Sequence, residues 1–307
     1  MVHKRISVRG SALFKLTSPA RLANILRITP VELDRLVGQA DANYTVWTSK
    51  SGRVIEEPKP ELKTIHSRLA WLLAQIETPE YLHSGVKKRS YVTNAAGHSA
   101  AAGAIKLDVK KFFPSARAAA VHEFFTTVME YPIDVASRMT TLLTYAGHLP
   151  TGGNASSILS FWAYKPMFDE LAALAAVHGC KFTVYVDDIT MSGKGATRAL
   201  QHKARKIIGA FHLKAHKNKV FSPRQPRVVT GVAITVRGQE LPNRRAAAIA
   251  QATAEIIEVE TDQQRLDLLP SLVGRVSEAA EIDPAWRGQK AAIVAMRQEI
   301  RRRKRVV

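Results

Sequence analysis

Three aspartates carry the chemistry that this sequence suggests. Asp108 closes a short apolar stretch, and Asp187-Asp188 separates two runs of strand-forming residues. Buried strands rarely end in carboxylates that lack partners. If the strands are neighbours in one sheet, the acids meet at one edge, where oxygen ligands without nearby His or Cys suit a hard divalent cation such as Mg²⁺. Two such ions support in-line nucleotidyl transfer, whereas an isolated Asp-Asp pair is most often a hairpin turn.

The elements around these acids alternate between strand and helix. We expect a strand over 104–107 and a hairpin over 181–191 with the two acids at its tip. A helix beginning at Pro114 precedes a Gly-rich loop over 147–153, and the next helix is interrupted at Pro166 and ends at Gly179. The first of these helices has a core face of Val121, Phe124, Phe125 and Val128.

The flanking regions are mainly helical. Ser18-Pro19 and Thr29-Pro30 begin two short helices, the second of which stops at Gly38. A basic β-hairpin over 44–57 and a helix with an apolar stripe from Leu62 to Ile76 follow. After the acids we expect a helix over 197–211, strands near 220 and over 228–236, and about 70 helical residues. A capping box at Thr261 and a start at Asp283-Pro284 mark the last helices.

Composition narrows the class of protein. The 307 residues include 45 Lys and Arg and 26 Asp and Glu, a net charge of +19, and 46% are hydrophobic, which excludes general disorder. The sequence holds no apolar run long enough to span a bilayer. It contains one cysteine, Cys180, so a disulfide framework and a Cys-based zinc site are excluded and a cytoplasmic setting is expected. The positive charge indicates a polyanionic partner, most simply nucleic acid. The alternative interpretation is a solvated basic surface without a partner.

Four short motifs occur in the order typical of reverse transcriptases. Tyr185-Val186-Asp187-Asp188 resembles their YxDD box, and Asp108 with 109–115 (Val-Lys-Lys-Phe-Phe-Pro-Ser) resembles their first acidic motif. Leu149–Gly153 (Leu-Pro-Thr-Gly-Gly) resembles the LPQG loop, and 216–219 (His-Lys-Asn-Lys) the motif that follows YxDD. One such box is a weak signal, but their order and spacing over about 44–237 make coincidence improbable.

Two further boxes narrow the resemblance to retron reverse transcriptases. Asn94–His98 (Asn-Ala-Ala-Gly-His) is similar to the retron NAxxH box, and Val229-Thr230-Gly231 is similar to the VTG triplet. The resemblance implies an α+β, right-hand polymerase fold, with a palm built of an antiparallel sheet and helices. The expected domains are an N-terminal helical segment over 1–40, fingers and palm over 41–237, and a helical thumb over 238–307 with a basic tail, Arg301–Arg305.

The resemblance also implies roles for single residues. Asp108, Asp187 and Asp188 would be the catalytic residues and, with Val109, the ligands of two Mg²⁺ ions, with Mn²⁺ as a possible substitute. The nucleotide would be bound by Arg53, Lys50, Phe113, Thr151, Gly152 and Lys219. Among these, Phe113 stands where the family excludes a ribose 2′ hydroxyl, Lys219 where a lysine faces the leaving pyrophosphate, and Arg53 where a guanidinium grips the triphosphate.

Some of these roles have competing interpretations. Lys219 is equally interpreted as a solvated lysine, and Lys50 is better interpreted as a charge at the loop tip. Phe113 can also be interpreted as a core residue, an interpretation that fits Phe112 better. Thr151 replaces the usual Gln, and Val186 replaces the usual Ala, so the nucleotide and primer contacts of this chain depart from the pattern. Asn94 and His98 have either a structural or an RNA-facing role. The same two alternatives apply to Val229, Thr230 and Gly231.

The implied function is that of a retron RNA-directed DNA polymerase. Such an enzyme copies part of a structured noncoding RNA into single-stranded DNA, primed from a 2′ hydroxyl of that RNA and so linked to it, using deoxynucleoside triphosphates. The family implies antiphage defence with a separate effector protein, and no membrane partner is expected. The alternatives are a nucleic-acid-binding scaffold with secondary polymerase activity and a reverse transcriptase related to those of group II introns.

Overall fold

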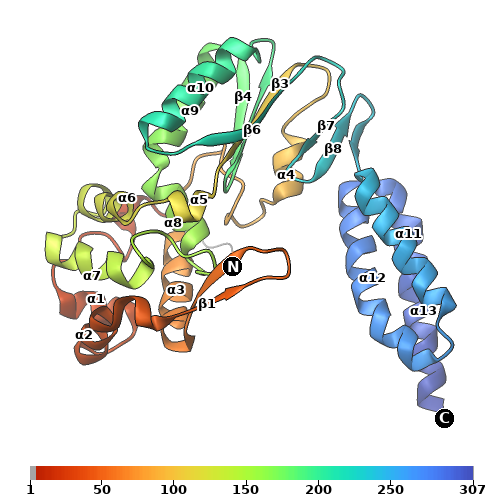
Figure 1. Ribbon diagram of the computed structural model, residues 1–307, viewed down its shortest axis with the longest axis horizontal. Coiled ribbons are helices and arrows are strands. Elements are labelled where there is room, and N and C mark those ends of the chain that lie inside the picture. The colour runs from red at the N-terminus through yellow and green to blue at the C-terminus, as the bar shows by residue number, and fades with distance from the viewer. Residues whose placement is uncertain (1–4, 307) are drawn as a thin grey trace. The chain divides into compact units, whose positions relative to one another are not determined.

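The chain forms two compact units. The computed structural model describes residues 5–306, with side chains through 304, so Met1–Lys4, Val307 and the side chain of Arg305 in the basic tail lie outside the described residues. Unit 1 consists of Met1–Ser90 and Ile105–Val220, and unit 2 of Tyr91–Ala104 and Phe221–Val307 (Figure 1). This grouping differs from the three segments expected from the sequence; the division into fingers, palm and thumb stays a prediction.

Unit 1 begins with short capped helices. A 3₁₀ turn, η1 (Val8–Gly10), precedes α1 (Pro19–Leu26), where Ser18 caps the first turn, and α2 (Pro30–Gln39), where Thr29 and Glu32 form the expected capping box. The expected stop at Gly38 is wrong, because α2 runs through it and ends where Ala40 takes a φ of +35°. A further 3₁₀ turn, η2 (Ala40–Asn43), leads into the hairpin.

The expected basic hairpin is present. Strand β1 (Tyr44–Thr48) pairs antiparallel with β2 (Val54–Pro58), and α3 (Pro60–Leu73) follows. The whole expected apolar stripe is buried, although Ile76 lies beyond the end of α3, in a bridge to Ile6. The hairpin therefore projects from a helical base in which α1, α2 and α3 pack together (Figure 1).

A four-stranded sheet lies at the centre of unit 1. Its order is β4 (Cys180–Tyr185), β5 (Asp188–Gly193), β3 (Ala104–Val109) and β6 (Ala215–Phe221). The expected hairpin with the acids at its tip is confirmed by the antiparallel pairing of β4 and β5. Strand β3 is longer than expected and includes Asp108. Helix α10 (Arg198–Ala210), capped by Thr197, precedes β6.

Helices between β3 and β4 build the rest of unit 1: α5 (Phe112–Ser115), α6 (Ala118–Glu123), a π-helical turn η3 (Phe124–Val128), α7 (Ile133–Leu143), α8 (Ser156–Ala163) and α9 (Lys165–Val177). The single helix expected from Pro114 is wrong. The chain leaves helical geometry at Ala116, and the Arg117 amide donates to the Tyr164 hydroxyl at 3.2 Å. Val128, expected in the core, is 38% exposed, whereas the expected break near Pro166 separates α8 from α9.

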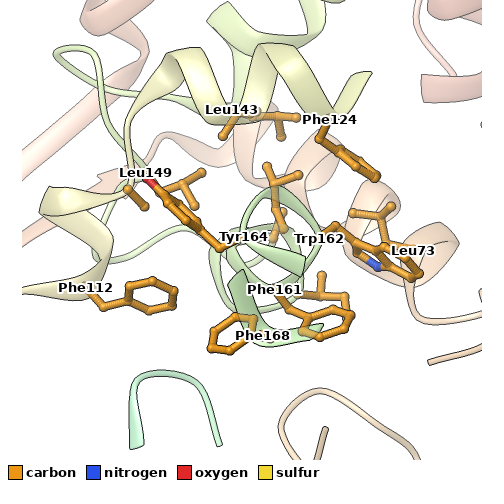
Figure 2. Packing of buried hydrophobic residues seen from close by; sticks show 14 of the residues in the cluster. Leu73, Phe112, Phe124, Leu143, Leu149, Phe161, Trp162, Tyr164 and Phe168 are labelled. Carbon is orange, nitrogen blue, oxygen red and sulfur yellow. The ribbon is translucent and has the colours of Figure 1, made fainter. Parts of the chain in front are cut away.

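Aromatic side chains from α8 and α9 fill the core of unit 1. Phe161 stacks on Phe168 and Trp162 on Phe124, each with ring centroids 5.9 Å apart (Figure 2). Leu73 from α3, Leu143 from α7 and Leu149 from the Gly-rich loop join the same cluster. Stacked rings bury large apolar areas, so this cluster fixes the loop that carries Thr151 and Gly152.

Unit 2 combines a small sheet with three long helices. Helix α4 (Tyr91–Ala96) packs on β8 of the sheet β7 (Arg227–Val229), β8 (Val232–Thr235) and β9 (Gly238–Glu240). Helices α11 (Asn243–Glu258), α12 (Asp262–Ile282, with the expected capping box) and α13 (Arg287–Val306) follow (Figure 1). The strand expected over 228–236 is split by a turn, and Asp283-Pro284 begins a 3₁₀ turn, η4 (Pro284–Trp286), rather than α13.

The mixture of helices and antiparallel pairs is compatible with the expected α+β class. Within 5–306, no helix is long and apolar enough to cross a membrane. Cys180, at the start of β4, is a buried free thiol.

Candidate active site

The sheet brings the three aspartates to one edge, as the sequence predicts. Asp108 lies near the end of β3, Asp188 begins the neighbouring β5, and Asp187 occupies the loop between β4 and β5. The Val109 amide donates to the Asp187 carbonyl oxygen at 3.1 Å, which ties the hairpin tip to β3. The predicted convergence is therefore a consequence of strand order.

The acids destabilise one another's charge. Burial and then the negative charge of Asp108 raise the pKa of Asp187 to about 6; the Asp187 amide and Arg53 pull in the other direction. Burial also raises the pKa of Asp108, although His216 and Lys217 oppose it. Raised carboxyl pKa values at one edge of a sheet mark a place where additional positive charge would be favourable.

Three basic side chains, which sequence reasoning did not assign to the acids, lie beside them. Lys106 Nζ is 3.1 Å from Asp188 Oδ1, His216 Nδ1 is 3.1 Å from Asp108 Oδ1, and Lys217 Nζ is 3.8 Å from Asp108 Oδ2. Strand alternation could have found Lys106, because residues two apart on a strand share a face and so place Lys106 beside Asp108. His216 and Lys217 lie in the motif already noted after YxDD.

The donor set suits a hard cation. Asp188 Oδ1 is buried and has no hydrogen bond, despite its ion pair with Lys106. Carboxylate oxygens are the ligands that Mg²⁺ prefers. Over the described part of the chain, however, no group of three His, Cys, Asp or Glu side chains is drawn together closely enough to hold a metal ion. Lys106, His216 and Lys217 instead neutralise the carboxylates, so metal ligation, including that by Val109, stays a proposal.

The predicted nucleotide-binding residues lie on separate elements of unit 1. Arg53 and Lys50 are exposed on the β1–β2 hairpin, and only Arg53 has a resolved electrostatic effect on Asp187. Phe113 is half-buried and stacks on Phe112 with ring centroids 6.0 Å apart, so the core interpretation fits Phe112 better. Lys219 is exposed on β6, two residues beyond Lys217, which is the lysine that reaches Asp108.

Glu56, a buried acid that sequence reasoning missed, joins the hairpin to the Gly-rich loop. Its Oε2 accepts from the Thr151 amide at 3.0 Å and from the Thr151 hydroxyl at 3.4 Å, and its Oε1 contacts His148 Nε2 at 3.0 Å. A Cβ on Gly152 would lie 2.8 Å from the Glu56 carbonyl oxygen, so only glycine fits there. The Thr151 hydroxyl thus bonds to the protein, and its nucleotide contact stays a prediction.

The two retron-like boxes meet inside unit 2. Asn94 Nδ2 donates to Thr230 Oγ1 at 3.3 Å, and that hydroxyl donates to the Tyr91 carbonyl oxygen at 2.8 Å. Thr230 and Gly231 have φ values of +46° and +84°, which is the geometry of a type I′ turn between β7 and β8. The side chains of Asn94, His98 and Val229 are buried. These positions favour the structural interpretation that the sequence left open beside the RNA-facing one.

Comparison with known proteins also points to reverse transcriptases. No protein-family model matches the chain. Several curated proteins that the chain resembles are reverse transcriptases named for a retron. The chain is 30% identical over 181 residues to the retron Se72 reverse transcriptase of Salmonella heidelberg, covering 56% of this chain and 47% of the relative. It is 28% identical over 290 residues to the retron Mx162 enzyme of Myxococcus xanthus, covering 79% and 58%.

A third relative is the retron Ec86 reverse transcriptase of Escherichia coli, 26% identical over 227 residues, or 70% of each chain. These matches confirm the resemblance to retron-type reverse transcriptases. The chain spans about half the length of the first two relatives.

Proposed function

We propose that the protein is an RNA-directed DNA polymerase of the retron type, which extends a primer with deoxynucleoside triphosphates on an RNA template. The observation that carries the proposal is the meeting of Asp108, Asp187 and Asp188 at one sheet edge, where the pKa of Asp187 is raised to about 6. Similarity to named retron reverse transcriptases supports the template and substrate classes.

Asp108 and Asp187 would hold two Mg²⁺ ions, or Mn²⁺ in their place, with the Val109 carbonyl as a further ligand. When bound, such ions would supply activation of the primer hydroxyl and positive charge for the leaving pyrophosphate. Asp187, with a pKa of about 6, is largely ionised at pH 7.5 and therefore ready to bind a cation. Asp188, paired with Lys106, would contribute mainly by fixing the hairpin tip.

The incoming nucleotide would lie between the hairpin and the acids. Arg53 is suited to the triphosphate because its fork of donors matches phosphate oxygens, and its charge already acts on Asp187. Lys217 and Lys219 would face the leaving pyrophosphate, and Lys50 would add charge at the hairpin tip. Gly152 allows close backbone approach, and the half-buried ring of Phe113 would exclude a ribose 2′ hydroxyl.

The biological partners are proposed from the family. The template would be a structured noncoding RNA, primed from one of its own 2′ hydroxyls, and the product would be single-stranded DNA linked to it. The protein would act in the cytoplasm with a separate effector protein, in antiphage defence.

The test is to express the chain with its flanking genomic DNA and to isolate small DNA whose mobility changes after RNase treatment. We expect such DNA from the unmodified chain and none from Asp187→Asn, because that substitution removes one of the charges that would hold Mg²⁺. Both proteins should bind the transcribed RNA with similar affinity.

Asp134→Asn is the matched control, since Asp134 is an exposed acid in the first turn of α7. It should give DNA at the normal level. DNA that persists in Asp187→Asn would overturn the catalytic assignment, and RNA binding without any DNA from the unmodified chain would favour a scaffold.

A further inference from the structure

A stretch of unit 1 after the acids carries only positive charge. Residues 189–220 contain no Asp or Glu and include eight basic residues: Lys194, Arg198, Lys203, Arg205, Lys206, Lys214, Lys217 and Lys219. Four of them lie on α10, which buries Leu200, Ala204 and Ile208 and exposes its opposite face. Like charges three or four residues apart on a helix repel one another. Binding of an anion to this face would relieve that repulsion.

The protein itself does not supply that anion. Among the described residues, no ion pair involves α10. Lys203 contacts only His178, at 3.4 Å. Where α10 ends and β6 begins there is an open cavity of about 280 Å³, here called the α10 groove, whose charged or titratable lining residues are His202, Arg205, Lys206 and Lys214. The other three lining residues carry no charge.

The chain segment that borders the α10 groove also leads to the candidate active site. The Lys110 amide, just after β3, donates to the Lys214 carbonyl oxygen at 2.8 Å. Lys217, three residues further along β6, reaches Asp108. Basic side chains therefore lie both beside the acids and at the groove, with β6 between them. The phosphates of one nucleic acid strand could contact both sets of side chains.

We propose that the α10 groove binds the sugar-phosphate backbone of the noncoding RNA, outside the active site. This proposal rests on the proposed function for the identity of the RNA. Arg and Lys in a concave surface match phosphodiester oxygens and read no sequence. A lipid headgroup shares this chemistry, but a membrane-surface helix also presents large apolar side chains. None of the large hydrophobic residues that are exposed in the described chain lies on α10.

The test compares two triple variants of equal charge change. R205Q/K206Q/K214Q alters the groove, and R9Q/R21Q/R27Q alters three exposed arginines elsewhere in unit 1. Binding of the transcribed noncoding RNA is measured over a series of salt concentrations. We expect the groove variant to reduce the slope of log affinity against log salt by about two to three, roughly one for each lost phosphate contact, and the control by less than about one.

Primer extension on a short DNA-primed RNA template should be retained in both variants. An unchanged slope, an equal loss in the control, or loss of binding to phosphatidylglycerol vesicles without loss of RNA binding would overturn the proposal. Because the readout is binding, it stays informative if the unmodified chain does not extend a primer, which is the result that would refute the proposed function instead.

A second inference comes from the backbone of the hairpin tip. Val186, which precedes Asp187, has a φ of +58°. β-Branched residues rarely adopt this left-handed conformation, which is strained and persists only where surrounding contacts enforce it. The tip that carries Asp187 is therefore held by something other than its own sequence.

Residues 79–89, here called the strap, run beside the edge strand β4. The Val184 amide donates to the Tyr81 carbonyl oxygen at 2.8 Å, and the His83 amide donates to the Val184 carbonyl oxygen at 2.9 Å. Beyond these backbone bonds, the Val186 amide donates to Ser84 Oγ at 3.1 Å. Ser84 is 3% exposed, so its hydroxyl is a fixed acceptor.

The strap is closed on itself by Arg89 and tied to α9 by Tyr81. Arg89 Nη1 donates to the carbonyl oxygens of Pro79 and Leu82, both at 2.7 Å, and the Tyr81 hydroxyl donates to Asp169 at 2.6 Å. These contacts keep the Ser84 hydroxyl in place relative to β4. We infer that Ser84 is a positioning residue: it holds Val186 in the left-handed conformation and thereby orients Asp187.

The test is a double-mutant cycle, again resting on the proposed polymerase. Ser84→Ala should lower kcat about tenfold, the value of one hydrogen bond of roughly 1–1.5 kcal/mol, with the KM for deoxynucleotide changed less than about twofold. Ser84→Thr, which keeps the hydroxyl, should restore kcat. In a V186G background, Ser84→Ala should cost less than about threefold, because glycine adopts φ > 0 without help.

Full activity of Ser84→Ala, or an equal loss in both backgrounds, would overturn the inference. Thermal unfolding of each variant separates positioning from folding, and Ser84→Thr provides a folded protein if Ser84→Ala does not fold. An inactive unmodified chain would refute the proposed function and not this role, whose remaining readout is the accessibility of the Val186 amide to hydrogen exchange.

Discussion

At the scale of single residues, the ionised carboxylate of Asp187 destabilises the folded protein at the candidate active site. Burial and neighbouring carboxylates raise the pKa of Asp187 from 3.8 to about 6, so ionisation is harder in the folded than in the unfolded chain. An acid with a raised pKa lowers folded-state stability as the pH rises between these two values. The contribution of Asp187 to the stability of the protein without divalent cations should therefore fall from pH 4 to pH 6.

Asp187→Asn removes this destabilisation. Without divalent cations, we expect the variant to match the unmodified chain at pH 4 and to exceed it at pH 7.5 by at most about 3 kcal/mol, since each pKa unit is worth 1.36 kcal/mol. The measurement is thermal or urea unfolding at both pH values, with Asp134→Asn as control. A variant no more stable than the unmodified chain at pH 7.5 would contradict the assigned pKa.

At the scale of elements, close backbone contacts fix the Gly-rich loop to the β1–β2 hairpin. The Gly152 amide donates to the Glu56 carbonyl oxygen at 3.1 Å, and Glu56 also holds Thr151 and His148. Because the hairpin carries Arg53 and the loop carries Thr151, this junction determines how two groups of predicted nucleotide ligands lie relative to each other.

Gly152→Ala should disturb that junction. The added Cβ would lie 2.8 Å from a backbone oxygen, so we expect a loss of about 1–3 kcal/mol in the free energy of unfolding. Gly209→Ala is a matched control: it lies in α10 with nothing within 4 Å of the new Cβ and should stabilise by roughly 0.5–1 kcal/mol. Equal effects of the two substitutions, measured by urea unfolding, would refute the close-contact argument.

Local patterns predicted most elements, and long-range contacts account for the failures. The capping boxes at Thr29 and Thr261 and the β4–β5 hairpin depend on residues close in sequence. The break before α6 depends on the Tyr164 hydroxyl, 47 residues from Arg117, and the pairing of Glu56 with Thr151 spans 95 residues. The acids were found because each lies in a recognisable short motif, whereas Glu56 and Ser84 have no local pattern to mark them.

At the scale of the whole molecule, a buried arginine holds the two segments of unit 2 together. Arg227, only 3% exposed, donates through Nη2 to the carbonyl oxygens of Ala100 and Ala102 at 3.1 and 2.9 Å. Its guanidinium is therefore the hydrogen-bond donor to the Ala102 carbonyl oxygen, and it shares the Ala100 carbonyl oxygen with the Arg224 amide, which donates at 2.7 Å.

Arg227→Ala should destabilise unit 2 selectively. Unsatisfied buried carbonyl groups cost about 1–3 kcal/mol, so amide hydrogen exchange should accelerate at least about fivefold in α4 and β7–β9 and much less in β3–β5. Arg244→Ala, at an exposed position in α11, is the control. Uniform acceleration across both units would show that they do not unfold separately.

The split composition of unit 2 also matters while the chain is being made. Tyr91–Ala104 is separated from Phe221–Val307 by the 116 residues from Ile105 to Val220. At about 5–20 residues per second, the ribosome needs roughly 6–23 seconds to translate these intervening residues before the rest of unit 2 begins. During that interval Asn94 and His98, buried in the finished protein, have no Val229–Gly231 turn to cover them. A nascent chain would thus complete its second unit only late in synthesis, after every aspartate of the candidate active site has left the ribosome.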